Sequence, residues 1–151
     1  MRSRESGVTL IEMLIVVTII ALVAGLSLPS ISSGLDSIRL RSASNSIVSL
    51  LNTSLDRADR RQQAIEISIS MRDNSIAARS ADQNFTRRVE LLDPVHIAGV
   101  QPAIPIDPNL PRRFLIYPGG AVPGISIELA TASGHKRTVA IDPITGVPQA
   151  K

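Results

Sequence analysis

The 151-residue chain has no cysteine and no tryptophan, and it contains one tyrosine and two phenylalanines. Without cysteine the chain can form no disulfide, provide no thiolate nucleophile and hold no metal through sulfur. Its three aromatic residues, Phe85, Phe114 and Tyr117, are too few to build a platform on which nucleic-acid bases could stack. The fold must therefore depend on aliphatic packing.

The charged and polar residues do not indicate catalysis. A balance of 16 basic and 13 acidic residues gives a net charge of +3, which permits weak attraction to phosphates but does not require it. The two histidines, His96 and His135, have no acid or nucleophile at a catalytic spacing, and the aspartates stand singly in turn-like contexts. The segment "YPGGAVPG" lacks the Gly-Lys-Ser/Thr of a phosphate loop. We expect no enzyme activity, no metal and no cofactor.

A long apolar run lies near the amino end. From Val8 to Leu28, 21 residues contain Glu12 as the only charge, and a helix rising about 1.5 Å per residue would span a bilayer core of about 30 Å. The run is longer than the apolar part of a cleavable secretory signal, which has about 7–15 residues. Because Arg2 and Arg4 precede it, the positive-inside rule places the amino end in the cytoplasm. Residues 8–28 are predicted to form one transmembrane segment.

A second helical pattern follows directly. Apolar residues recur every three to five positions after Pro29, which is the spacing of an amphipathic helix; they are Leu35, Ile38, Ala43, Ile47, Leu50, Leu51, Leu55 and Ala58. A proline inside a helix usually kinks its axis. We therefore predict one helical segment over residues 8–61, running from about Thr9 to about Arg61 and kinked at Pro29.

The remaining residues, 62–151, change to a strand period. "AIEISISM" alternates apolar and polar residues, and "DNS" is a turn signal before a return strand, "SIAARS". Further strands are predicted at "RRVELL", "RFLIY", "ISIELA" and "RTVAI", with antiparallel pairing because the connections are short. Five prolines between Leu92 and Arg112 exclude a central strand there and predict a long loop, centred on residues 93–111, or an irregular edge. The fold class is α+β, with the amphipathic stripe packed on a small antiparallel sheet.

The amino-terminal stretch "GVTLIEMLIVV" resembles the processing and assembly signal of type IV pilins and type II secretion pseudopilins. The resemblance implies a pilin-like fold, a leader peptide of residues 1–7, cleavage after Gly7 by a prepilin peptidase and N-methylation of Val8. The family usually has phenylalanine where this chain has Val8. The resemblance also implies a single-pass protein of the inner membrane with its carboxyl-terminal domain in the periplasm.

The same resemblance gives Glu12 a role. A carboxylate in hydrocarbon costs about 2–3 kcal/mol even on lenient insertion scales. In the family this glutamate faces the methylated amine of a neighbouring subunit, which relieves the cost in one axial register. Glu12 is then an assembly residue, and the implied partners are other pilins or pseudopilins in a hetero-oligomeric filament and an inner-membrane assembly platform. The alternative is a plain membrane anchor with an interfacial acid.

The carboxyl half is similar to the H class of type II secretion minor pseudopilins, which share a family with T-class minor pilins of type IV pili. In that family an aromatic-x-Pro-x-Gly turn leads into a hairpin, and a Thr-Gly near the terminus closes the sheet. Here Tyr117, Pro118, Gly120 and Gly124 correspond to the first, with Tyr117 directly before Pro118, and Thr145 with Gly146 corresponds to the second. The similarity implies a subunit of a secretion pseudopilus that exports proteins. Two alternatives remain: a minor pilin for fibre priming or DNA uptake, and a membrane-tethered binding domain that does not polymerise.

Basic doublets are the only feature that favours DNA binding. They are Arg60-Arg61, Arg87-Arg88, Arg112-Arg113 and Lys136-Arg137. Because adjacent residues on a strand point to opposite faces, a doublet there adds only one charge to each side. We expect solvated surface charge and no nucleic-acid partner, with Arg112, Arg113, Lys136 and Arg137 as the candidate DNA or partner contacts.

Overall fold

The computed structural model describes residues 8–151 except 83, 105–106, 108–109, 121 and 143, and it describes only the backbone of residues 26–33. The predicted leader, residues 1–7, lies outside the described residues. The chain divides into two compact units, Met1–Leu35 and Asp36–Lys151. The first unit holds the apolar part of the long helix, and the second holds the rest of that helix and all the strands.

Helix α1 (Leu10–Arg61) has 52 residues and begins one residue after the predicted start at about Thr9. It ends where Gln62 takes a positive φ of 52° and the N–H of Gln63 donates to the carbonyl of Ala58 at 3.2 Å, a geometry that satisfies one of the last free carbonyls. Pro29 lies within α1, but side chains 26–33 are outside the described part of the chain. The kink there stays a prediction.

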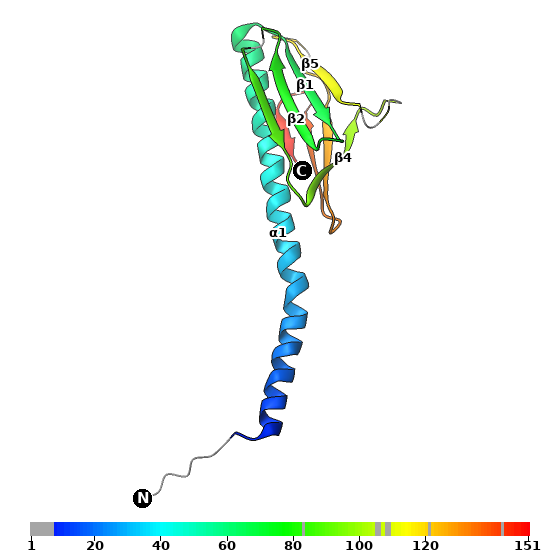
Figure 1. Ribbon diagram of the computed structural model, residues 1–151. Helices are drawn as coiled ribbons and strands as arrows, with labels where there is room; N and C mark the ends of the chain where they lie inside the picture. The colour runs from blue at the N-terminus through cyan, green and yellow to red at the C-terminus, as the bar shows by residue number, and fades with distance from the viewer. Residues whose placement is uncertain (1–7, 83, 105–106, 108–109, 121, 143) are drawn as a thin grey trace, which may run out of the picture. The chain divides into compact units, whose positions relative to one another are not determined.

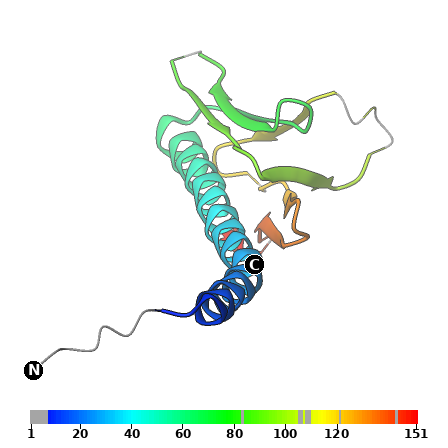
Figure 2. The ribbon, with the colours of Figure 1, turned by 60° about the horizontal axis from the view of Figure 1, so that its bottom comes forward.

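The second unit contains two four-stranded antiparallel sheets, whereas the sequence predicted one (Figures 1 and 2). The first sheet has the order β3-β2-β1-β5 and the second the order β4-β6-β7-β8. The strands are β1 (Ile65–Ser70), β2 (Ser75–Ser80), β3 (Thr86–Glu90), β4 (Val95–Gln101), β5 (Arg112–Ile116), β6 (Ser126–Thr131), β7 (Lys136–Ile141) and β8 (Pro148–Ala150).

Strand β4 occupies the proline-rich segment. It is the edge of the second sheet, and its pairing with β6 shifts register between Ile97 and Gly99, so the predicted irregular edge is confirmed and a long loop over the whole segment is wrong. Pro94 and Pro102 stand just outside the strand, where a missing N–H costs no ladder bond. The short strand β8 was not predicted, because three residues are too few for a readable alternation.

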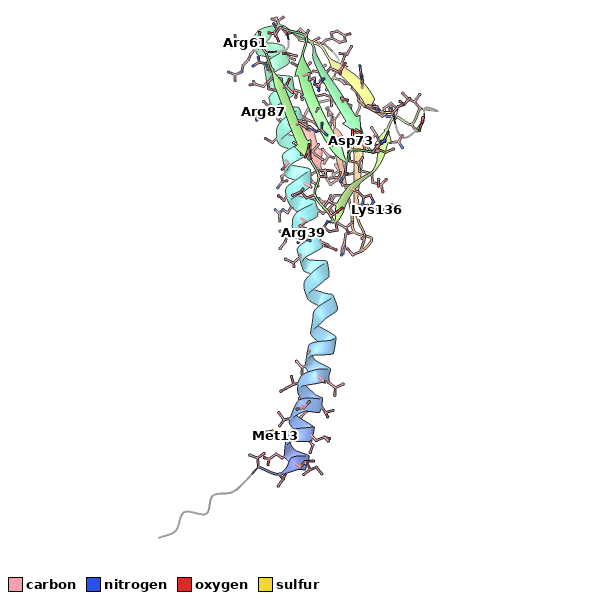
Figure 3. The ribbon with its side chains drawn as sticks, in the orientation of Figure 1. Met13, Arg39, Arg61, Asp73, Arg87 and Lys136 are labelled. Carbon is pink, nitrogen blue, oxygen red and sulfur yellow. The ribbon has the colours of Figure 1, made fainter. Side chains whose placement is uncertain are left out.

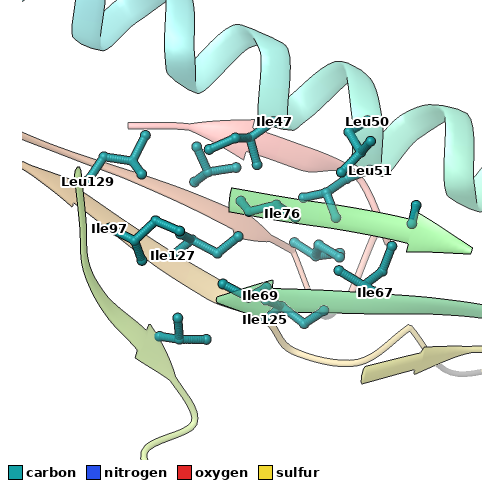
Figure 4. Close-up of a cluster of buried hydrophobic side chains, with 14 of the residues drawn as sticks. Ile47, Leu50, Leu51, Ile67, Ile69, Ile76, Ile97, Ile125, Ile127 and Leu129 are labelled. Carbon is teal, nitrogen blue, oxygen red and sulfur yellow. The ribbon is translucent and has the colours of Figure 1, made fainter. Parts of the chain in front are cut away.

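One hydrophobic core joins the helix to both sheets (Figure 4). Isoleucine dominates it, which suits the pleated faces of strands. Its fully buried side chains include Ile47 and Leu51 from α1, Ile67, Ile69 and Ile76 from the first sheet, and Ile127 and Leu129 from the second. Each such side chain stabilises the fold by about 1.5–3 kcal/mol through burial.

The buried stripe of α1 differs from the predicted one at its start. Leu35 and Ile38 are 48% and 67% exposed, whereas Leu40 is 2% exposed, so the prediction that the first two are buried is wrong. The buried face also includes Ser44 and Ser54, whose hydroxyls donate to the carbonyls four residues earlier at 2.7 Å. A serine that satisfies its own hydroxyl can lie in an apolar face, and this was missed because only apolar residues were counted.

A fragment of residues 36–151 should fold without the apolar part of α1. It keeps every buried residue of the core, and it keeps the hydrogen bond in which the Ser133 hydroxyl donates to the Asp36 carboxylate at 2.7 Å. We expect a soluble, strand-rich monomer that unfolds cooperatively, measured by circular dichroism and sedimentation. A disordered spectrum would show that the stripe and the sheets do not form a self-sufficient core.

Asn74 joins the first sheet to the strand that begins the second. In the β1–β2 turn it has a φ of 48°, a conformation that asparagine tolerates well. Its side-chain amide donates to the carbonyls of Leu91 at 3.0 Å and Val95 at 2.8 Å, and its Oδ1 accepts from the N–H of Ile97 at 3.0 Å. Both the donors and the acceptor of this one side chain are therefore satisfied across the two sheets.

Replacing Asn74 should destabilise the fragment. Asn74→Ala removes three hydrogen bonds and should lower the free energy of unfolding by about 2–3 kcal/mol in urea titrations. Asn74→Asp retains the acceptor for Ile97 but places a carboxylate oxygen against the carbonyls of Leu91 and Val95, so in a neutral-pH titration it should destabilise the fragment at least as much as Asn74→Ala. A change in Asn74→Ala no larger than that of an exposed surface substitution would contradict this role.

Candidate processing and assembly site

The amino end of α1 is capped by Thr9, the residue that follows Val8. The Thr9 hydroxyl accepts the N–H of Glu12 at 3.3 Å, and the Thr9 carbonyl accepts the N–H of Met13 at 3.2 Å. Thr9 is thus the N-cap, a role that its Thr-x-x-Glu spacing could have predicted. Val8 precedes the cap, is not helical and is 64% exposed, so the residue after the expected cleavage bond is accessible. Gly7 lies outside the described residues.

Glu12 occupies the third position of the helix, and its side chain is exposed. Among the described residues, none forms a hydrogen bond or ion pair with its carboxylate. The helix dipole favours a negative charge there, by about 0.3–1 kcal/mol. That is less than the roughly 2–3 kcal/mol that an acid costs in hydrocarbon, so the cap alone does not compensate for an apolar surrounding. A cation from outside the unit could.

The remaining surface of this helical segment is apolar and open. All side chains from Val8 to Gly25 are exposed, and the hydroxyl of Thr18 is occupied by the Leu14 carbonyl at 2.7 Å. A continuous apolar surface of this kind marks a place where lipid or another protein lies. Within the described part of the chain, no helix meets the length and hydropathy needed to cross a membrane.

Residues 2–28 match the family model described as the prokaryotic N-terminal methylation motif. This segment is a prepilin-type signal. The match includes Gly7, Val8 and Glu12, and it supports a type IV pilin-like protein that is processed by prepilin peptidase and assembles with other pilins. No curated protein and no solved structure gives a significant match.

The four basic residues singled out for DNA or partner contact do not gather on one sheet. Arg112 and Arg113 belong to β5 in the first sheet, and Lys136 and Arg137 belong to β7 in the second. Three of the four have contacts within the chain. Arg112 donates to the Pro102 carbonyl at 2.7 Å, Arg113 lies 3.9 Å from Glu66, and Lys136 lies 2.8 Å from Glu128.

Two turns carry the motifs of the carboxyl half. In the first, the N–H of Gly119, which has a φ of 60°, donates to the Asp59 carboxylate at 3.0 Å and so ties the turn to the end of α1. In the second, between β7 and β8, the Asp142 carboxylate accepts two backbone N–H groups, which lowers its pKa. Gly146 closes this turn with a φ of 70°. Both turns are structural joints.

No described residues form a cluster of three or more metal-ligating side chains. His96 and His135 are both exposed, on β4 and in the turn before β7. The strongest carboxylate shift belongs to Asp82, whose pKa falls to about 2 chiefly because the Ser80 hydroxyl donates to it. That pair stabilises the β2–β3 turn and needs no ligand to account for it.

Proposed function

We propose that this chain is a minor pseudopilin of the H class in a type II secretion system. It is cleaved after Gly7, methylated at Val8 and incorporated into a short periplasmic filament that works in protein export. It is the substrate of a peptidase and not itself an enzyme. The observation that carries the proposal is the Thr-Leu-Ile-Glu sequence behind Gly7, in a matched methylation motif that opens a single helix leading to a β-rich body.

The site geometry supports an assembly role for two groups. Cleavage would free the amine of Val8, next to the cap formed by Thr9, and the carboxylate of Glu12 lies on the surface without a partner among the described residues. Two opposite charges about 4 Å apart attract by about 4 kcal/mol at an effective dielectric of 20. This attraction is of the same order as the roughly 2–3 kcal/mol cost of the acid in hydrocarbon, so an amine of another subunit would offset much of that cost.

The proposed class rests on the two turns of the carboxyl half. The turn at Gly119 and Gly120 joins the end of β5 to the end of α1, and the Thr145-Gly146 turn joins β7 to β8. These are the two turns on which the resemblance to the H class rests. The methylation motif itself is common to pilins and pseudopilins, so these turns carry the finer assignment.

The secretion role is preferred over DNA uptake because the candidate basic residues are separated and engaged. Arg112, Arg113 and Lys136 each contact groups of this chain, and the sheets that carry them differ. A phosphate backbone would have to displace those contacts. A tethered domain that does not polymerise would offer Glu12 no cation from another subunit.

Processing is the first test of the proposal. Intact mass of the protein isolated from membranes should show a chain that begins at Val8 and carries one added methyl group. Gly7→Val should keep the leader, because a branched side chain next to the cleaved bond obstructs the peptidase. Val8→Phe is the matched control: it restores the residue usual in the family and should be processed fully. A wild-type chain that retains residues 1–7 would contradict the proposal.

A further inference from the structure

Strand β3 leaves one side of its backbone open. It pairs only with β2, in the register Ile76↔Val89 and Ala78↔Arg87. The N–H of Ser80 donates to the Phe85 carbonyl at 3.0 Å at one end. Hydrogen-bonded pairs alternate along an antiparallel ladder, so residues 85, 87, 89 and 91 face β2. The N–H and C=O groups of Thr86, Arg88 and Glu90 therefore point away from it, with no strand partner among the described residues.

A groove runs between this open edge and α1. One hollow of about 480 Å³ is lined by Ser42, Ser46 and Ser49 of the helix and by Arg87 and Val89 of the strand. A second hollow of about 430 Å³ continues from Arg87 to the carboxyl end of α1. Small hydroxyl side chains on the helix keep the groove wide. The Ser46 hydroxyl donates to the Ser42 carbonyl at 3.1 Å, so its oxygen remains free to accept.

The second hollow is cationic. Four arginines and one acid line it, and the acid, Asp56, is paired with Arg60. The other three arginines, Arg57, Arg61 and Arg87, have no described acid within ion-pair distance. Arg57 lies over the Phe85 ring at 4.7 Å, and its buried Nε has no hydrogen-bond partner among the described residues. The Arg57 guanidinium is thus held by the ring at one edge of the hollow.

The other charged side chains at this hollow and beside it form ion pairs, so Arg57, Arg61 and Arg87 are its unpaired charges among the described residues. Asp56 pairs with Arg60 at 2.7 Å and raises its pKa, and Glu90 pairs with Arg88 at 3.0 Å. Figure 3 labels Arg61 and Arg87, which come from α1 and β3 and line the same hollow, whereas Lys136 lies on β7 of the other sheet. Three arginines without an ion pair among the described residues therefore line one hollow.

From these features we propose that the groove binds an extended acidic segment of a partner protein, which adds to β3 as a further strand. Main-chain bonds to Thr86, Arg88 and Glu90 would supply affinity, and carboxylates on alternate residues would meet Arg57, Arg61 and Arg87. Nucleic acid fits less well, because it offers no strand backbone and because Phe85 is already covered by Arg57. The inference does not depend on the pseudopilin role.

The test uses the full chain in detergent and a labelled, end-blocked peptide of about ten residues that alternates Glu and Val, a length that covers a typical strand. Fluorescence anisotropy should show saturable binding that weakens as salt rises. The same peptide with Lys in place of Glu should not bind. Failure of the Glu peptide to bind would overturn the proposal.

Two matched pairs of variants separate the backbone contribution from the charge. Arg88→Pro removes an outward N–H and should weaken binding about tenfold or more, whereas Arg88→Ala loses the same ion pair but keeps the N–H and should change it little. The double variant Arg61→Glu with Arg87→Glu should abolish binding, and Arg113→Glu, outside the groove, should reduce it about twofold at most. Thermal unfolding followed by circular dichroism verifies that each variant folds.

Two results would contradict the proposed strand addition. Equal binding by the Arg88→Pro and Arg88→Ala variants would show that charge alone holds the peptide. A single-stranded DNA oligonucleotide that binds more tightly than the peptide, and loses its binding in the Arg61→Glu, Arg87→Glu variant, would make the groove a nucleic-acid site. Because neither measurement uses processing, failure here leaves the proposed function standing.

Discussion

Helix α1 carries two kinds of surface, and this difference organises the whole chain. Up to Gly25 its described side chains are mostly apolar and all exposed, so this chain does not cover them. From Leu40 onward it presents a stripe that two sheets bury. The first surface is left for lipid or another protein to cover, and the second completes the hydrophobic core with the two sheets. Glu12 is the one charge in the first surface, which makes its partner the main physical question.

The features that could be predicted are those that depend on residues close together in the sequence. A period of 3.6 residues located α1, alternation located β1 and β2, and the turn residues separated them. The division of the strands into two sheets could not be predicted in this way. It depends on which strands pair, and on the bonds from Asn74 to Leu91, Val95 and Ile97, which join groups 17 to 23 residues apart. No local pattern encodes such a contact.

The candidate sites also differ in whether nearby residues in the sequence could reveal them. Gly7, Val8 and Glu12 lie within six positions, so a short motif was sufficient to find them. The groove at β3 was not found, because it forms only when residues 42–61 of the helix lie beside residues 85–89. Arg87 was counted as one half of a surface doublet, since strand alternation assigns it to a face but does not say what covers that face. The serine-rich stretch "RSASNSIVSLLNTS" was the available signal.

We propose that Glu12 holds the subunit in register through the amine of a neighbour. The direct measurement is co-purification of the processed chain with other pilin-like subunits from membranes, comparing wild type with Glu12→Leu and Glu12→Gln. Both variants remove the charge, and the second keeps the shape of the side chain. We expect insertion and cleavage to survive in both variants, because a costly charge is lost, and recovery in the assembly to fall for both. Undiminished recovery of both variants would contradict it.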